Sequence, residues 1–194
     1  EYMMKDGYIV VYQDVRGRWM SEGDYDNMRA YIPNKKKGQV DEASDTYDTI
    51  DWLVKNVDNN NGNVGTWGIS YPGFYATYSL LDSHPALKAV SPQACIGDFF
   101  FDDFHHNGAY LLSYWRATAV FGYQTEPTTE SWYDFPQLDT QDQYQFFLDN
   151  GPLSNLDEYY KEDNEFWTQL KDHPNYDEFW KSRGIIQHLK DIKP

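Results

Sequence analysis

The chain has 194 residues, a formal net charge of −15 and a single cysteine, Cys95. Its length suits one domain, or one domain with a large insertion, and an aromatic content of 18% excludes an unfolded segment. The negative charge disfavours nucleic acid and anionic membrane surfaces as partners, and one cysteine excludes an internal disulfide or a cysteine-rich zinc module.

No run of about eighteen apolar residues is present, so the sequence predicts no membrane span. The first residues do not show the basic and then apolar pattern of a signal peptide. Because the chain starts at Glu1 rather than at a methionine, this pattern does not exclude a signal peptide that was removed earlier. Cys95 is expected in a core, where most single cysteines lie.

The first half of the chain alternates strand and helix patterns. Residues 7–17, GYIVVYQDVRG, form a continuous β-branched and aromatic run, which predicts a strand buried on both faces. Asp14 and Arg16 at its end are interpreted as an ion pair that braces the following loop, with direct substrate contact as the alternative. Residues 41–56 carry apolar side chains at helical spacing, with acids first and Lys55 last, which predicts an amphipathic helix.

A turn at residues 58–63 leads into a second predicted strand at 63–69. A second helix is predicted over 72–83 and a third strand over 86–92. Because helices connect successive strands, we expect the strands to be parallel, in an α/β fold.

From about residue 97 the sequence becomes a series of aromatic-rich patterns with helical spacing. They cover residues 99–121, 141–150, 155–173 and 175–184, separated by loops that contain proline and glycine. We interpret this half as a helical insertion packed above the sheet.

Ser70 lies between a predicted strand and a predicted helix, in the sequence VGTWGISYPGFYA. A sharp strand-to-helix turn exposes a serine hydroxyl and supplies backbone amides to an attacked carbonyl, and Gly68 allows the two elements to approach closely. The spacing is G-x-S-x-x-G, with Pro72 at the usual second glycine position. The residues leave two interpretations open: a nucleophile, or a serine that only caps the helix.

Several blocks together resemble a known family: YIVVYQDVRGRWMSEGDY, DTIDWLVKN, GNVGTWGISYPGF, HPALKAVSPQA and FDDFHHNGAY. The sequence is similar to X-Pro dipeptidyl-peptidases, cocaine esterase, glutaryl-cephalosporin acylases and α-amino acid ester hydrolases, most of all to the branch of the α-amino acid ester hydrolases and acylases. The resemblance implies part of an α/β-hydrolase catalytic domain in residues 1–96, a helical cap in 97–190, and a return to the catalytic domain in 191–194. It implies Ser70 as nucleophile and the backbone amide of Tyr71 as oxyanion donor.

The family's catalytic residues follow the chain order Ser, Asp, His. The resemblance places the acid and the histidine beyond Pro194 and a second oxyanion donor, a tyrosine, before Glu1, so we expect an internal piece of a longer hydrolase that is inactive by itself. His105 and His106, which follow two acids, are the only pair considered as a substitute base, and this alternative is disfavoured.

Asp98, Asp102 and Asp103 gather just after the third predicted strand. The resemblance implies a carboxylate near this place that binds the substrate's free ammonium group, with Asp103 the best match and Asp102 the second. The alternative is that these acids only favour a helix N-terminus. Adjacent helical residues point about 100° apart, so Asp102 and Asp103 with the two following histidines do not predict a metal site.

The sequence therefore predicts a serine hydrolase of the α-amino acid ester hydrolase or acylase type. The alternatives are an X-Pro dipeptidyl-peptidase and a non-catalytic binding domain. The expected partner is a small-molecule or peptide substrate with a free α-amino group, no cofactor or metal is implied, and self-association is left open. The resemblance favours secretion or a periplasmic location.

Overall fold

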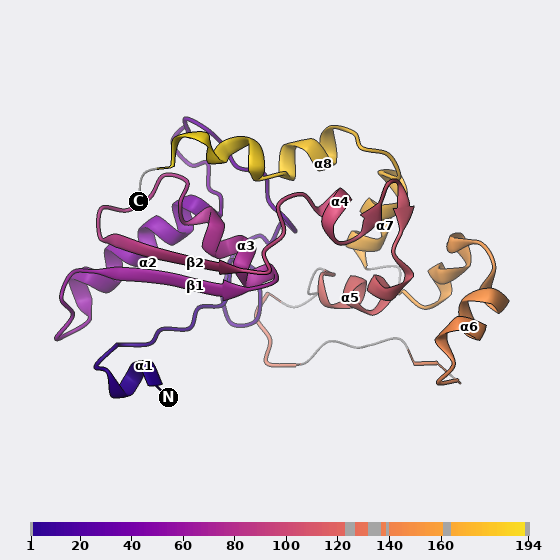
Figure 1. Ribbon diagram of the computed structural model, residues 1–194, viewed down its shortest axis with the longest axis horizontal. Helices are drawn as coiled ribbons and strands as arrows, with labels where there is room; N and C mark the ends of the chain where they lie inside the picture. The colour runs from indigo at the N-terminus through magenta and orange to yellow at the C-terminus, as the bar shows by residue number, and fades with distance from the viewer. Residues whose placement is uncertain (1, 123–126, 132–136, 139, 161–163, 193–194) are drawn as a thin grey trace.

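The computed structural model describes residues 2–122, 127–131, 137–138, 140–160 and 164–192 (Figure 1). The α-helices are α1 Tyr2–Lys5, α2 Glu42–Asn56, α3 Tyr71–Tyr78, α4 Phe99–Asp102, α5 Trp115–Val120, α6 Gln143–Asn150, α7 Glu165–Asp172 and α8 Glu178–Arg183. Short 3-10 helices are η1 Leu112–Tyr114, η2 Leu153–Glu158 and η3 Ile186–Asp191. The strands are β1 Val64–Ile69, β2 Leu87–Gln93, β3 His105–His106 and β4 Ala109–Tyr110. No helix in these ranges has the length and apolar content to cross a bilayer.

Helix α2 forms where the sequence predicts it. Asp41 caps it: its carboxylate accepts from the Ser44 amide at 3.0 Å, and the Ser44 hydroxyl accepts from the Asp41 amide at 2.9 Å. This reciprocal arrangement satisfies backbone donors that the first turn leaves without helical partners. Ile50 is buried on the inner face of the helix, where it packs with Leu87 of β2.

Strands β1 and β2 pair in parallel, as predicted, with Trp67 opposite Ser91 and Ile69 opposite Gln93. Helix α3 connects them and packs against both strands. It is shorter than the predicted 72–83 helix and begins directly after Ser70. Figure 1 shows β1, β2, α2 and α3 at one end of the molecule and α4 to α7 towards the other.

The strand predicted over residues 7–17 is wrong. Residues 8–15 have no regular secondary structure, and residues 8–14 are exposed, with Tyr8 at 67% and Tyr12 at 89% of full exposure. A strand is stabilised by backbone hydrogen bonds to a neighbour, and in the described part of the chain β1 pairs with β2 alone. The expected Asp14–Arg16 ion pair is also wrong, because Arg16 binds the Asp45 carboxylate of α2 at 2.5 and 2.8 Å.

The predicted helix over residues 99–121 is wrong in its middle. After α4 the chain makes a short antiparallel hairpin, β3 and β4, before α5 begins. The hairpin turns at Asn107 and Gly108, whose φ angles are +51° and +87°. Asn-Gly is the dipeptide that most favours such a two-residue turn, so local turn chemistry prevails over helical periodicity here.

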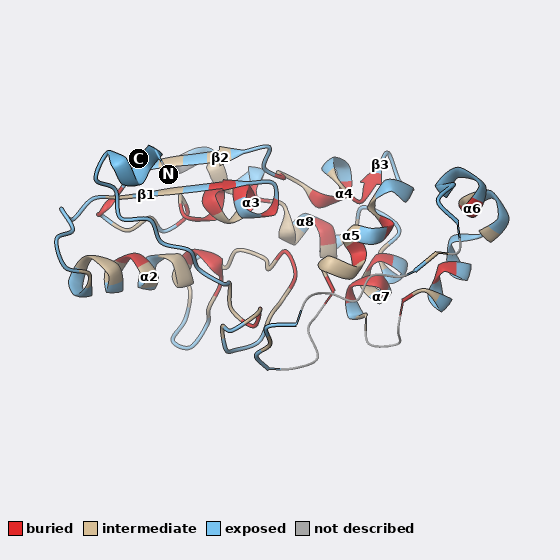
Figure 2. Cartoon of the chain, turned by 90° about the horizontal axis from the view of Figure 1, so that it is seen from below, coloured by how far each residue is buried: buried red, intermediate tan, exposed pale blue. Residues whose placement is uncertain are grey.

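Aromatic side chains form the main core and join the two halves of the molecule. Figure 2 shows buried residues concentrated in α3, α4, α5 and α7. The buried aromatic members of this cluster include Tyr71, Phe74, Tyr78, Phe99, Phe104, Phe166, Trp167 and Trp180. Cys95, which was expected in a core, is exposed instead. It follows the bend at Ala94 after β2 and precedes Ile96, which is buried in the core.

The helical half starts and finishes at one place in the fold. The amide of Ile185 donates to the carbonyl of Gly97 at 3.0 Å, so the chain returns after α8 to the point where it left β2. An insertion into a sheet domain requires this return. The division into residues 1–96, 97–190 and 191–194 stays a prediction.

Candidate active site

Ser70 occupies a sharp bend between β1 and α3. Its φ and ψ are +62° and −125°, a conformation that non-glycine residues rarely adopt. The bend is held by the backbone: the Ser70 amide donates to the Gln93 carbonyl at 2.9 Å, and the Phe74 amide donates to the Ser70 carbonyl at 3.0 Å. The residue is exposed, and its side chain makes no capping hydrogen bond to α3. The helix-cap alternative is therefore wrong, and the hydroxyl is left available.

Two glycines allow this bend to form. A β-carbon at Gly68 would lie 2.1 Å from the Pro72 carbonyl oxygen, and one at Gly73 would lie 2.7 Å from the Gln93 carbonyl oxygen. Real β-carbons essentially never approach other atoms within 3.0 Å. The strand, the bend and the helix thus pack closer than any side chain would allow.

Tyr71 is the first residue of α3. The helical hydrogen bonds begin with the Phe74 amide, so the Tyr71 amide precedes them, as do the first amides of any helix. Pro72 follows without an N–H to contribute. The Tyr71 ring is 7% exposed and packs among the rings of Phe99 and Phe121, with ring centroids 5.5 and 4.9 Å away.

The two candidate substrate-binding carboxylates differ in what they contact. Asp102 is exposed, and its Oδ2 accepts from the amides of Gly97 and Asp98 at 2.7 and 2.9 Å. Asp103 is half-buried, and its Oδ1 accepts from the Tyr114 hydroxyl at 2.8 Å. Burial raises the pKa of Asp103, against the opposing effect of that hydroxyl. Asp102 is engaged as a local cap, whereas Oδ2 of Asp103 accepts no hydrogen bond from the described residues.

The two neighbouring histidines lie on the β3 strand. His105 is 4% exposed, stacks on Phe100 at 4.7 Å and meets Trp180 at 5.3 Å. Its Nδ1 has no hydrogen-bond partner within the described ranges, and burial lowers its pKa. His106 is exposed. In the part of the chain that the structure describes, no side chain hydrogen-bonds the Ser70 hydroxyl, and no three acids, cysteines or histidines gather as a metal site would.

A sharp bend that presents a serine before a helix is characteristic of hydrolases that use a serine nucleophile. The family model described as X-Pro dipeptidyl-peptidase (S15 family) matches residues 1–194, the full length of the chain. The chain belongs to this family. Both the family and the α/β fold class predicted from the sequence are thereby confirmed, and the members of this S15 family are hydrolases of esterase and peptidase types.

Similar proteins have several named activities. The cocaine esterase of Rhodococcus sp. (strain MB1 Bresler) is 28% identical over 96% of this chain. The crystal structure of an aminopeptidase from the marine sediment archaeon Thaumarchaeota archaeon has a TM-score of 0.85, with 33% identity over 98% of the chain. A selenomethionine-labelled α-amino acid ester hydrolase has a TM-score of 0.83, with 34% identity over 94%. The chain spans 32%, 31% and 29% of these three proteins, respectively.

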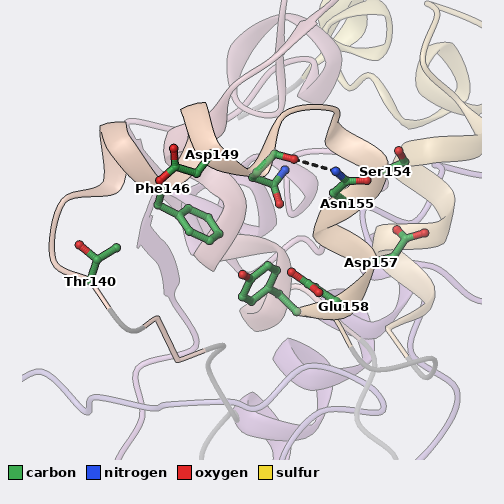
Figure 3. A pocket seen from close by; sticks show the side chains of 9 residues that line it. Thr140, Phe146, Asp149, Ser154, Asn155, Asp157 and Glu158 are labelled. Carbon is green, nitrogen blue, oxygen red and sulfur yellow. Dashed lines mark hydrogen bonds between the residues drawn. The ribbon is translucent and has the colours of Figure 1, made fainter.

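Two surface hollows of this S15 family chain lie away from the bend. One, of about 580 Å³, lies between α6 and η2, and Figure 3 shows Asp149, Asp157 and Glu158 at its rim. The other, of about 360 Å³, is lined by residues that include Tyr31 and His188. Ser70 is not among the residues that line either hollow.

The structure also brings to the bend a loop that the sequence did not indicate. Asn27 and Met28, both fully buried, hydrogen-bond the Tyr71 hydroxyl from a position more than forty residues earlier. Residues 21–28 carry no periodic pattern and read as an ordinary polar turn, so no local signal predicts this contact.

Proposed function

We propose that this chain is the nucleophile-bearing part of a serine hydrolase, with Ser70 as the nucleophile. The observation that carries the proposal is the exposed, uncapped hydroxyl at a positive φ between β1 and α3. A buried or capped hydroxyl at this place would have argued for a helix end alone. Membership of a hydrolase family supports the same assignment.

In the proposed reaction the Ser70 oxygen attacks the carbonyl carbon of an ester or amide. Its proton passes to a histidine base, which donates it to the leaving alcohol or amine as the C–O or C–N bond breaks. Water, deprotonated by the same base, then releases the acyl group from Ser70. The Tyr71 amide donates to the carbonyl oxygen while that oxygen carries negative charge.

The base and its acid are proposed to come from residues beyond 1–194, as the family's chain order implies. A serine hydroxyl without a base is a poor nucleophile near neutral pH. Residues 1–194 purified alone are therefore expected to hydrolyse an activated ester no faster than buffer does. Rapid Ser70-dependent hydrolysis by this piece would show that a base lies within it.

We infer a substrate with a free α-amino group, of the α-amino acid ester hydrolase or acylase type. Two structural neighbours with this fold are named as an aminopeptidase and an α-amino acid ester hydrolase, and both names denote an amino-acyl substrate. Asp103 is proposed to hold the ammonium group, because one of its carboxylate oxygens is uncommitted while Asp102 is engaged with backbone amides. Asp102 stays the second candidate.

A fluorophosphonate probe applied to the full-length gene product tests the nucleophile. Labelling that disappears in Ser70→Ala is the expected result. Absence of labelling in the unaltered protein would favour the alternative of a non-catalytic binding domain. Relative rates on an amino-acid ester and on an X-Pro amide then separate the esterase or acylase type from the X-Pro dipeptidyl-peptidase type.

The ammonium assignment has its own matched pair of variants. Asp103→Asn is expected to lower kcat/KM for an amino-acid ester by about 10- to 100-fold, the effect of losing a partly buried charge pair, and to leave hydrolysis of the N-acetylated ester unchanged. Asp102→Asn serves as the control and should not alter the ratio between the two substrates. If Asp102→Asn rather than Asp103→Asn lowered the rate on the amino-acid ester relative to the N-acetylated ester, Asp102 would be the ammonium ligand. If neither variant changed this ratio, neither residue would bind the ammonium group.

A further inference from the structure

The Tyr71 side chain ends in a buried hydrogen-bond network. Its hydroxyl donates to Asn27 Oδ1 at 2.6 Å and accepts from the Met28 amide at 2.7 Å. The Tyr25 hydroxyl donates to the same Asn27 oxygen at 3.0 Å. Burial raises the pKa of Tyr71 well above its usual value, so the phenol remains a neutral donor throughout the physiological range.

This network fixes the residue that carries the proposed oxyanion donor. The peptide N–H and the phenol of Tyr71 belong to one residue, whose position is fixed on two sides. Its ring packs in the aromatic core, and the amide of the preceding residue, Ser70, donates to the Gln93 carbonyl. An N–H must point at the developing oxyanion within a few tenths of an ångström to stabilise it well. Without the hydrogen bonds of the hydroxyl, the Tyr71 ring and the Cα that carries it are free to shift together, and the peptide N–H at the start of α3 shifts with them.

The loop that receives the hydroxyl is itself anchored on its other side. Met28 is fully buried with a φ of +53°. Arg183 of α8 reaches the same loop, with its Nη2 3.2 Å from the Asp26 carboxylate and its Nε 3.4 Å from the Asn27 carbonyl. Asn27 is therefore a fixed point rather than a side chain that would follow a moving tyrosine.

We propose that Asn27 and the Tyr71 hydroxyl are positioning residues for catalysis. Asn27 holds the phenol, and the phenol sets the direction of the Tyr71 amide towards the oxyanion. This inference rests on the proposed function and adds to it the part of the fold that orients the donor. Both side chains are buried, so neither is proposed to touch the substrate.

The test is Tyr71→Phe in the full-length gene product, which removes one oxygen and keeps the ring. Loss of an oriented donor costs about 10²- to 10³-fold in kcat when complete, so a misdirected donor is expected to cost about 10- to 100-fold. KM should stay within about twofold, because ground-state binding does not depend on the oxyanion. Affinity for a boronic acid that forms a tetrahedral adduct on Ser70 should fall by the same factor as kcat.

Tyr78→Phe is the matched control. Tyr78 is 1% exposed, and its hydroxyl donates a hydrogen bond to the carbonyl of Arg29, which follows the same loop. It lies two turns further along α3 than Tyr71. It is expected to lower the melting temperature by a similar amount and to leave kcat unchanged. If Tyr71→Phe and Tyr78→Phe lose stability alike and neither changes kcat, the Tyr71 hydroxyl only packs the core and the inference is overturned.

Asn27→Ala provides a second route to the same step, since it removes the acceptor and leaves Tyr71 intact. It is expected to reproduce the kcat loss of Tyr71→Phe, and the double variant should be no slower than either single one. Independent, multiplying losses would contradict a shared role. The proposed function is tested separately. If Ser70→Ala kept full activity, Ser70 would not be the nucleophile, whatever the result for Tyr71→Phe.

Discussion

Gly68→Ala adds only one methyl group, but we expect it to distort the bend at Ser70. The added methyl group would lie 2.1 Å from the Pro72 carbonyl oxygen and 2.3 Å from its carbon, where real contacts stop near 3.0 Å. The end of β1 and the start of α3 must therefore separate by about 0.9 Å. Both contacts are with backbone atoms, so no side-chain rotation can relieve them.

The expected cost has two parts. Overpacking of a well-ordered site lowers the free energy of unfolding by about 1–3 kcal/mol. A displacement of about 1 Å at the reacting residues costs about 10²-fold in rate. Gly65→Ala in the same strand is the control: its β-carbon would lie 3.5 Å from the Ala89 carbonyl oxygen, an ordinary contact, and alanine is favoured over glycine in a strand by about 0.5–1 kcal/mol.

Urea unfolding of the two variants and fluorophosphonate labelling of Ser70 in the full-length protein measure these effects. Gly68→Ala should shift the urea midpoint downwards and slow labelling, while Gly65→Ala should do neither. Equal midpoints and equal labelling rates for the two variants would refute the argument that close approach at Gly68 creates the bend.

Two further predictions concern pH. Burial raises the pKa of Glu42 to about 7, although Arg29, 3.4 Å away, has the opposite effect. Between about pH 4.5 and 7 the folded chain therefore keeps a proton on Glu42 that the unfolded chain releases. The free energy of unfolding consequently falls as the pH rises through this range. Glu42→Gln should remove this fall and, at about 1.4 kcal/mol per pH unit, raise the free energy of unfolding at pH 8 by about 3 kcal/mol; an unchanged urea midpoint at pH 8 would contradict it. For His105 burial lowers the pKa, so the unfolded chain takes up a proton first and stability falls as pH drops below about 6.5. His105→Phe should flatten the urea midpoint between pH 7 and 5, whereas the exposed control His106→Gln should leave that slope as it is, and equal slopes would count against the explanation.

The parts of this fold that the sequence predicts are those whose signals are local. Asp41 and Ser44 cap α2 through contacts three residues apart, and the apolar run before Ser70 forms β1 as expected. The exposed run at residues 8–14 has equally strong β propensity, but a strand also needs a partner from elsewhere in the chain. The sequence of a segment shows its β propensity but not whether a partner strand is available.

The same distinction applies to the candidate site. The bend at Ser70 is predicted because glycine, serine and proline act within six residues. The Tyr71–Asn27 hydrogen bond joins positions 44 residues apart, and no spacing rule anticipates it. At the hairpin after α4, the Asn107-Gly108 signal was present in the sequence, but the helical spacing of the surrounding aromatic residues obscured it.

The positive φ of Ser70 implies a cost in stability at this position. A serine held in this region costs about 1–3 kcal/mol that glycine would not incur. Ser70→Gly should therefore be the more heat-resistant protein and Ser70→Ala should not, although both lack the hydroxyl. If stability alone decided the residue at this position, glycine would be favoured over serine.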